Sequence, residues 1–178
     1  MSVVQVHDKT FRPFIDRETI QKRVAELAKE IDRDFHGKVP LFIAILNGSF
    51  IFASDLFKSL TIEAEISFIK LDSYKGTSST GSVVTAIGMD ENLKDRHVII
   101  LEDIIDTGKT LQAFLPEIMD RDPASLKIAS FLTKPDALQY PIKADYVGFE
   151  VPDKFVLGYG LDYDGLGRNL PELYELVE

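Results

Sequence analysis

The sequence predicts one α/β domain with an open, mostly parallel, twisted sheet and helices on both of its faces. Three short apolar runs indicate strands that are buried on both sides, which is typical of parallel sheets. Segments with helical patterns alternate with these runs, so we expect covering helices to join the strands. The 178 residues fit a single domain, 1–178, and no repeat or linker divides them.

The first half of the chain contains two predicted helices and two predicted strands. A helix is expected after the N-cap residue Asp16, because apolar residues recur with the spacing of one helix face at Ile20, Val24, Leu27, Ala28, Ile31 and Phe35. Residues 39–46 predict a buried strand that ends at the turn Asn47-Gly48, and residues 50–60 predict the next helix. Residues 62–68 alternate between apolar and polar side chains, which indicates a second strand.

The second half continues the alternation after a polar loop. Residues 73–82 are rich in Gly, Ser and Thr and are expected to be mobile. A strand at 97–101, a helix at 111–119 and a strand at 127–132 follow. Ligands of such sheets bind beyond the carboxyl ends of the strands. The tail from residue 152, rich in Gly, Pro and aromatic residues, is expected to form a small irregular lobe over one end of the sheet.

Composition excludes several classes of protein. The chain has 20 basic and 29 acidic residues, a formal charge of −9, so we expect no broad binding to nucleic acid, which depends on Lys and Arg contacts to phosphates. Because Cys is absent, a disulfide scaffold, a thiolate zinc site and a Cys nucleophile are impossible. No apolar run reaches the roughly 18 residues of a membrane span, and the N-terminus lacks a signal-peptide pattern. We therefore expect a cytoplasmic protein with no membrane partner.

The most informative segment is residues 98–110, which read VIILEDIIDTGKT. Apolar residues lead a strand to its carboxyl edge, where the carboxylates of Glu102, Asp103 and Asp106 follow. The last residues are Thr107, Gly108, Lys109 and Thr110. They can hold a phosphate, because Gly allows close backbone approach, Thr hydroxyls donate and the next helix offers free N–H groups. The carboxylates suit hydroxyls or a divalent cation, so a sugar phosphate meets both conditions.

Two other interpretations of this segment carry less weight. A nucleotide P-loop needs a Gly five positions before its Gly-Lys, and Asp103 occupies that position. An acidic surface turn with a helix cap at Asp106 or Thr107 explains the Glu-Asp pair alone, but not the whole string.

Residues 98–110 resemble the phosphoribosyl-diphosphate (PRPP) signature of the type I phosphoribosyltransferases, specifically of the hypoxanthine-guanine phosphoribosyltransferases. Three more segments resemble this family in the same order and spacing. Residues 46–50 resemble its pyrophosphate loop, Ser73-Tyr74 the start of its catalytic loop, and residues 149–163 its purine-binding hood. The resemblance implies a type I phosphoribosyltransferase fold with a small hood subdomain, formed by the N-terminal segment and the segment after about residue 135.

The resemblance implies an enzyme of purine salvage that transfers the 5-phosphoribosyl group from PRPP to hypoxanthine, and also to guanine, and releases pyrophosphate. Asp106 would be the general base, while Glu102 and Asp103 would bind the ribose hydroxyls directly or through Mg²⁺. The 5′-phosphate would be held by Thr107, Gly108, Lys109 and Thr110. In the purine site, Lys134 would donate to the 6-oxo group. Phe155 would stack on the ring, and the backbone of Val156 would meet its Watson–Crick edge.

The resemblance also implies a pyrophosphate site and an assembly. Asp162 would bind Mg²⁺ and Arg168 would reach the pyrophosphate, over which Ser73 and Tyr74 would close. The pyrophosphate loop would be formed by Leu46, Asn47 and Gly48, with a cis peptide before Asn47. Many family members carry Lys where this chain has Asn47, so that charge is absent here. A homodimer or homotetramer is the implied assembly.

Simpler roles exist for single residues, and other functions exist for the fold. Phe155 alone could be a core residue, Lys134 a solvated charge and Asp162 a turn residue. A nucleotide-sensing regulator that binds RNA or DNA would need a basic surface or an added DNA-binding domain. This chain is too acidic for the first and too short for the second. Transfer to another base, such as xanthine or a pyrimidine, is the second alternative to a hypoxanthine-guanine enzyme.

Overall fold

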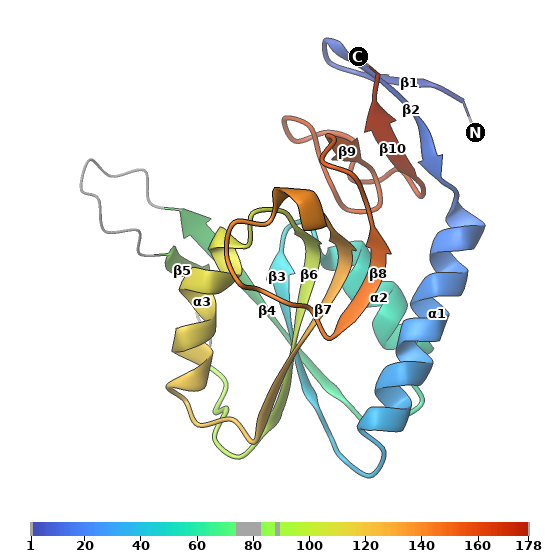
Figure 1. The fold of residues 1–178 in the computed structure, drawn as a ribbon. Coiled ribbons are helices and arrows are strands. Elements are labelled where there is room, and N and C mark those ends of the chain that lie inside the picture. The colour runs from blue at the N-terminus through green and yellow to red at the C-terminus, as the bar shows by residue number, and fades with distance from the viewer. Residues whose placement is uncertain (1, 74–82, 88–89, 178) are drawn as a thin grey trace.

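The computed structural model of the protein describes residues 2–73, 83–87 and 90–177 (Figure 1). In this part of the chain, the main sheet has six strands in the order β5-β4-β3-β6-β7-β8. Their bounds are β3 (Leu41–Leu46), β4 (Glu65–Ser73), β5 (Val83–Ile87), β6 (His97–Ile105), β7 (Ser125–Thr133) and β8 (Tyr146–Glu150). The pairs β4-β3, β3-β6, β6-β7 and β7-β8 are parallel, whereas β5 pairs with β4 in the antiparallel direction.

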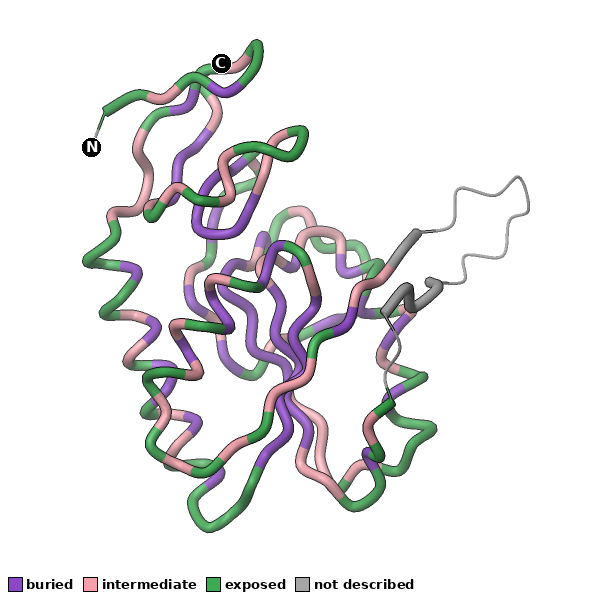
Figure 2. The backbone as a smooth tube through the Cα atoms, turned by 180° about the vertical axis from the view of Figure 1, so that it is seen from behind, coloured by how far each residue is buried: buried purple, intermediate pink, exposed green. Residues whose placement is uncertain are grey.

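Helices cover both faces of this sheet, as predicted. The helices α1 (Arg17–Asp34) and α2 (Phe50–Ser59) pack on one face, in a core that includes Phe42 and Ala44 of β3. The helix α3 (Lys109–Met119) packs on the other face, in a core that includes Ile43 of β3. Because successive residues of a strand point to opposite faces, one apolar run serves both cores. Figure 2 shows the inner strands buried along most of their length. The predicted fold class is confirmed.

The ends of the first helix follow from local chemistry. Asp16 has an extended backbone, and its Oδ1 accepts the Thr19 N–H at 2.7 Å, so it is the predicted N-cap. The apolar side chains of the helix point to the core: Ile20, Val24, Leu27, Ala28 and Ile31 are buried. Near the other end, the Asp32 carboxylate accepts the N–H groups of Thr61 and Ile62. This contact ties residues 61–62 to the end of α1, and β4 begins at Glu65 rather than at residue 62 as expected.

A second, antiparallel sheet joins the two ends of the chain (Figure 1). Its order is β1-β2-β10-β9, with β1 (Val4–Val6), β2 (Lys9–Ile15), β9 (Val156–Leu157) and β10 (Leu173–Leu176). Phe11, Leu157 and Tyr174 are buried in its small core. The tail was expected to be irregular, but β9 and β10 gain backbone hydrogen bonds because β10 pairs with β2 from the N-terminal segment.

The strand that leads to the site is longer than expected. It was predicted to end at Leu101, yet β6 continues to Ile105 because Glu102, Ile104 and Ile105 pair with Ser130, Leu132 and Thr133 of β7. The predicted mobile loop at 73–82 lies outside the described residues except for Ser73, the last residue of β4. In the described part of the chain, no helix combines the length and the apolar composition of a membrane span.

Candidate active site at the carboxyl ends of the strands

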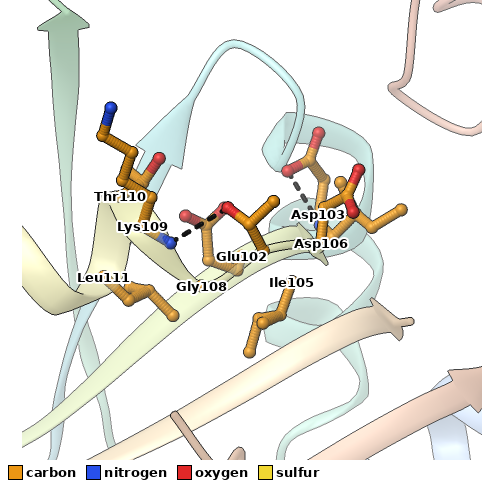
Figure 3. A pocket seen from close by; sticks show the side chains of 10 residues that line it. Glu102, Asp103, Ile105, Asp106, Gly108, Lys109, Thr110 and Leu111 are labelled. Carbon is orange, nitrogen blue, oxygen red and sulfur yellow. Dashed lines mark hydrogen bonds between the residues drawn. The ribbon is translucent and has the colours of Figure 1, made fainter. Parts of the chain in front are cut away.

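The turn from β6 to α3 forms a pocket of about 290 Å³ that is lined by residues 102–111 (Figure 3). Gly108 is the N-cap of α3 and has a φ of +83°. A Cβ on Gly108 would lie 3.2 Å from side-chain atoms of Leu138 and of Ile142, so a side chain would be both strained and crowded there. Because α3 begins at Lys109, which lines this pocket, the first backbone N–H groups of the helix lie at the pocket. Such a helix N-terminus is a suitable binding site for an anion.

Hydrogen bonds within this turn, and others from the segment after β7, fix its backbone. The Thr107 Oγ1 accepts the Lys109 N–H at 3.3 Å (Figure 3). The Thr107 carbonyl oxygen accepts the N–H groups of Gln139 at 2.9 Å and Tyr140 at 3.2 Å. The segment after β7 thus holds the phosphate-type loop in one conformation.

Two adjacent carboxylates lie at the end of β6. Glu102 is only 6% exposed, and burial, followed by the negative charge of Asp103, raises its pKa well above the usual range. Burial also raises the pKa of Asp103, although the positive charge of Arg168 acts in the opposite direction. The Asp103 Oδ1 accepts the Ile104 N–H at 2.8 Å (Figure 3). A pair of carboxylates of this kind, one buried and one half-buried, suits a divalent cation or donor hydroxyls.

The predicted pyrophosphate loop contacts Asp103. The Leu46–Asn47 peptide bond is cis, as the family resemblance implied. A Cβ on Gly48 would overlap the Asp103 carboxylate, and a Cβ on Gly160 would overlap the Gly48 carbonyl oxygen. Two glycines therefore allow the loop after β3, the end of β6 and the loop after β9 to meet.

A second pocket of about 250 Å³ adjoins the first. It is lined by Asp103, Ile104, Asp106, Lys134, Phe155, Val156, Leu161 and Asp162. The first three of these residues also line the phosphate-type pocket, so the two pockets share a wall. Phe155 is 43% exposed, and its ring packs against Phe11 and Tyr163 with centroid distances of 6.1 and 5.7 Å. A free aromatic face beside a polar wall suits a planar heterocycle.

Lys134 is the buried cation of this second pocket. Its side chain is 8% exposed, and its Nζ lies 3.3 Å from the Asp106 Oδ2 and 3.3 Å from the Asp153 Oδ1. Both carboxylates are more open to solvent, with 49% and 62% of their side chains exposed. One of the two counter-charges of the lysine, Asp106, therefore lines the pocket, while the aliphatic part of Lys134 is covered.

The loop after β9 holds the predicted pyrophosphate-binding arginine. Arg168 lies 2.8 Å from the Asp162 Oδ1 through its Nη2 and donates from its Nη1 to the Gly160 carbonyl oxygen at 2.7 Å. The Asp162 Oδ2 accepts the Gly165 N–H at 2.7 Å. These contacts position Arg168 close enough to Asp103 for its charge to act on that carboxylate.

The structure brings most predicted site residues to one edge of the main sheet, in two adjoining pockets and the Gly48 loop. Ser73 ends β4, but its side chain is not described, and Tyr74 lies outside the described residues. The predicted metal ligands Glu102, Asp103 and Asp162 do not form a cluster of their own, since no group of three or more His or acidic residues in the described part of the chain could hold a metal ion. The oxygen donors of Glu102 and Asp103 fit Mg²⁺ provided that the substrate supplies further oxygens.

Sequence reasoning missed several residues of this edge, among them Ile105 and Leu111 of the first pocket. Ile104 and Leu161 line the second pocket, and Asp153 is an ion-pair partner of Lys134. Ile104 and Leu161 are each adjacent in sequence to a predicted ligand, which is a weak signal. No local pattern indicated Asp153, because its contact depends on the order of strands in the sheet.

Comparison with known proteins agrees with this geometry. Residues 15–164 match the phosphoribosyl transferase domain, which is most of the chain. The chain belongs to the phosphoribosyltransferase family. The resemblance of residues 98–110 and the predicted type I phosphoribosyltransferase fold are thereby confirmed.

Several proteins similar to this phosphoribosyltransferase are named as hypoxanthine-guanine or hypoxanthine-guanine-xanthine phosphoribosyltransferases. The hypoxanthine-guanine phosphoribosyltransferase of Aquifex aeolicus is 37% identical over 172 residues, which are 96% of this chain and 97% of that protein. The hypoxanthine-guanine-xanthine phosphoribosyltransferase of Tritrichomonas foetus is 37% identical over 179 residues, which are 100% of this chain and 98% of that protein. A crystal structure of a Bacillus anthracis hypoxanthine-guanine phosphoribosyltransferase, with HEPES in its active site, has a TM-score of 0.88 and 40% identity, and the match covers 93% of this chain and 98% of that chain.

The raised pKa of Glu102 predicts a pH-dependent effect on stability. The folded state binds the Glu102 proton more tightly than the unfolded state, so the free energy of unfolding falls as the pH rises above the ordinary value of 4.5. Glu102→Gln, which stays neutral, should therefore raise the free energy of unfolding of this phosphoribosyltransferase at pH 7 in metal-free buffer. The gain should vanish at pH values below 4.5, where Glu102 is protonated in both states.

Thermal unfolding of the two proteins at pH 4 and pH 7 measures this difference. Glu117→Gln removes the same charge from an exposed position of α3 and serves as the control. A lower unfolding temperature for Glu102→Gln at pH 7 would contradict the pKa shift.

Proposed function

We propose that this phosphoribosyltransferase acts in purine salvage: it transfers the 5-phosphoribosyl group from PRPP to hypoxanthine and guanine, forms IMP or GMP, and releases pyrophosphate. The observation that carries the proposal is the shared wall of the two pockets. One pocket suits a sugar phosphate, and the other combines an exposed aromatic face with a buried ammonium donor. The named activities of the relatives from Aquifex aeolicus and Bacillus anthracis support the same substrate class.

In the proposed purine complex, the base enters the second pocket. Its ring stacks on Phe155, and its Watson–Crick edge meets the backbone of Val156, which begins β9. Lys134 donates a hydrogen bond to the 6-oxo group, because an ammonium has donors and no acceptor. This pose places the imidazole side of the purine toward Asp106, whose carboxylate lines both pockets.

In the proposed PRPP complex, the 5′-phosphate binds the turn of Thr107, Gly108, Lys109 and Thr110. The pyrophosphate lies between the Gly48 loop and Arg168. Local positive charge from Lys109 and Arg168 offsets the formal charge of −9, which would otherwise repel an anionic substrate. Ser73 and Tyr74 are proposed to close over the pyrophosphate, which would exclude water as a competing nucleophile.

The reaction is governed by charge. As pyrophosphate leaves, the ribose ring becomes positive and the departing oxygens become negative. Arg168 and the loop N–H groups stabilise the leaving group, and the carboxylates of Glu102 and Asp103 favour the positive ring. Asp106 accepts the imidazole proton of the purine, so that a ring nitrogen can attack the anomeric carbon.

Mg²⁺ is the proposed cofactor. Glu102 and Asp103, through ribose oxygens, and Asp162, near the pyrophosphate, would hold it together with PRPP. When bound, Mg²⁺ neutralises part of the charge of the pyrophosphate as it departs. The carboxylates of Glu102 and Asp103, which line the phosphate-type pocket, support this assignment, since without a cation they would face an anionic substrate.

Activity should therefore require a divalent cation. We expect excess chelator to lower turnover by at least about tenfold, given that a metal ion contributes several kcal/mol of charge stabilisation. Addition of Mg²⁺ beyond the chelator should restore it. The measurement is pyrophosphate release from PRPP and hypoxanthine, and full turnover in excess chelator would refute the assignment of these carboxylates.

Formation of IMP tests the proposed function itself. Incubation of the protein with PRPP, hypoxanthine and Mg²⁺ should give IMP and pyrophosphate in equal amounts, and omission of hypoxanthine should abolish both. Release of pyrophosphate without IMP would mean hydrolysis of PRPP and would contradict the proposal.

Four broader features belong to the proposal: the hood, the assembly, the location and a further substrate. We take the small sheet with the loops around it as the hood over the purine, because Phe155, Val156 and Asp162 line the second pocket from this side. A homodimer or homotetramer and a cytoplasmic location stay predictions. Xanthine is proposed as a third substrate, since the relative from Tritrichomonas foetus carries it in its name.

A further inference from the structure

We propose that Asp153 is a positioning residue of the purine site. Its carboxylate holds the Lys134 ammonium in place for the 6-oxo group of the base while Asp106 carries the purine proton. This inference rests on the proposed function, because it concerns recognition of a 6-oxopurine. It adds to that function a second counter-charge, which acts through Lys134 and not on the substrate.

Three neighbouring strands bring the charges together. Asp106 follows β6, Lys134 follows β7 and Asp153 comes shortly after β8, and these parallel strands are adjacent in the sheet. The backbone N–H of Lys134 donates to the Ile105 carbonyl oxygen at 2.9 Å, which ties the ends of β6 and β7 together. The Val151 N–H donates at 2.9 Å to the carbonyl oxygen of the residue before Lys134, which ties in the segment after β8. The lysine is therefore bracketed by one carboxylate on each side.

A tight turn fixes the position of Asp153. The Lys154 N–H donates to the Pro152 carbonyl oxygen at 2.7 Å, so Asp153 is the central residue of a three-residue turn. The proline ring also restricts the backbone just before Asp153. The carboxylate is thus held near Lys134 although 62% of its side chain is exposed.

The geometry of the ammonium leaves room for the base. Lys134 is buried, and a buried cation without a counter-charge is costly. Two of the three ammonium N–H donors are directed to the carboxylates of Asp106 and Asp153, and each N···O distance is 3.3 Å. Within the described residues the third donor has no hydrogen-bond partner, so it can donate to the 6-oxo group of a purine in the pocket.

The two carboxylates differ during the proposed reaction. When Asp106 accepts the purine proton it becomes neutral, and its attraction for Lys134 is lost. Asp153 is not among the residues that line the purine pocket, so the base does not transfer its proton there. Asp153 therefore remains the counter-charge of Lys134 in the state in which Asp106 is protonated. Without it, the lysine would move toward Asp106 before transfer and lose its partner afterwards.

Asp153→Asn tests this assignment. We expect kcat/KM for hypoxanthine and for guanine to fall about 3- to 10-fold, because a hydrogen bond to a charged group is lost at a partly exposed position. The change should lie in the KM for the base, while the KM for PRPP stays the same, since Asp153 is not among the residues that line the phosphate-type pocket. The preference for hypoxanthine over adenine should also decrease. Asp153→Glu, which keeps the charge, should restore most of the loss.

Asp136→Asn is the matched control. It removes the same charge two residues from Lys134, at an exposed position, but among the described residues the ion pairs of the Lys134 ammonium are with Asp106 and Asp153. Its kinetics should stay within about twofold of the parent, as for an ordinary surface substitution. Because Asp153 is largely exposed, Asp153→Asn should keep the unfolding temperature of the parent, which separates loss of function from loss of fold.

A double-mutant cycle shows whether Asp153 acts through the lysine. IMP affinity, measured by calorimetry, should fall in Asp153→Asn, but the same substitution should have no further effect in a Lys134→Met background. An equal loss in both backgrounds, equal changes in the KM of base and PRPP, or parent-like kinetics of Asp153→Asn would each overturn the inference. If the parent forms IMP and Asp153→Asn matches it, only this inference fails. If the parent forms no IMP, the proposed function fails, and the inference fails with it.

Discussion

Asp106→Asn should lower turnover of hypoxanthine by roughly 10² to 10⁴, which is the usual contribution of a general base. Asn keeps the shape of the side chain but cannot accept the purine proton. The Asp106 carboxylate lines both pockets and lies 3.3 Å from the Lys134 ammonium, so it is near the proposed purine and the proposed ribose. The KM for PRPP should change much less than kcat, because other residues hold the phosphates.

The alternative role for Asp106 is a helix cap. The structure contradicts this role, because Gly108 is the N-cap of α3. Steady-state kinetics with hypoxanthine measure the effect of Asp106→Asn on turnover, and thermal unfolding measures its effect on stability. If Asp106→Asn turns over hypoxanthine within a few-fold of the parent, Asp106 is not the base.

Lys134→Ala should weaken the use of hypoxanthine and narrow the gap between hypoxanthine and adenine. In the parent, the buried ammonium meets the 6-oxo acceptor of hypoxanthine, but it would face the 6-amino donors of adenine without a hydrogen bond. A site built around such a polar contact can discriminate by about 10⁴ or more, since the wrong partner leaves the contact unpaired. The ratio of kcat/KM for the two bases, in parent and variant, measures the effect.

Phe155→Ala is the informative comparison for Lys134→Ala. Its exposed ring lines the same pocket but carries no polar group, so it cannot recognise ring substituents. Loss of stacking should weaken hypoxanthine and guanine together by about 1 to 3 kcal/mol, with little change in their ratio. A selective loss of one base would contradict the stacking role of Phe155.

Local patterns predicted the helices and the phosphate-type turn well, because their causes lie within a few residues. The Asp16 cap, the apolar face of α1 and the glycine at the start of α3 are examples. The small sheet was not predicted, since β2 is stabilised by β10 from the opposite end of the chain. Strands β5 and β8 of the main sheet are short and were also not predicted.

The candidate site likewise contains residues that the local sequence predicts and contacts that form only in the folded protein. The residues of 98–110 are contiguous, so their shared location follows from the sequence alone. The position of Gly48 against Asp103, and of Gly160 against Gly48, depends on three loops that meet only in the folded protein. The pairing of Lys134 with Asp153 likewise requires β8 to lie next to β7, which no local pattern indicates.

The central claim is transfer of the phosphoribosyl group to 6-oxopurines, and a panel of bases tests it most directly. Pyrophosphate release from PRPP should be measured with hypoxanthine, guanine, xanthine and adenine at one Mg²⁺ concentration, and the nucleotide product identified in each case. We predict formation of IMP and GMP and a kcat/KM for adenine that is about 10⁴ lower than that for hypoxanthine. Use of adenine as efficiently as hypoxanthine would contradict both the role of Lys134 and the 6-oxopurine specificity.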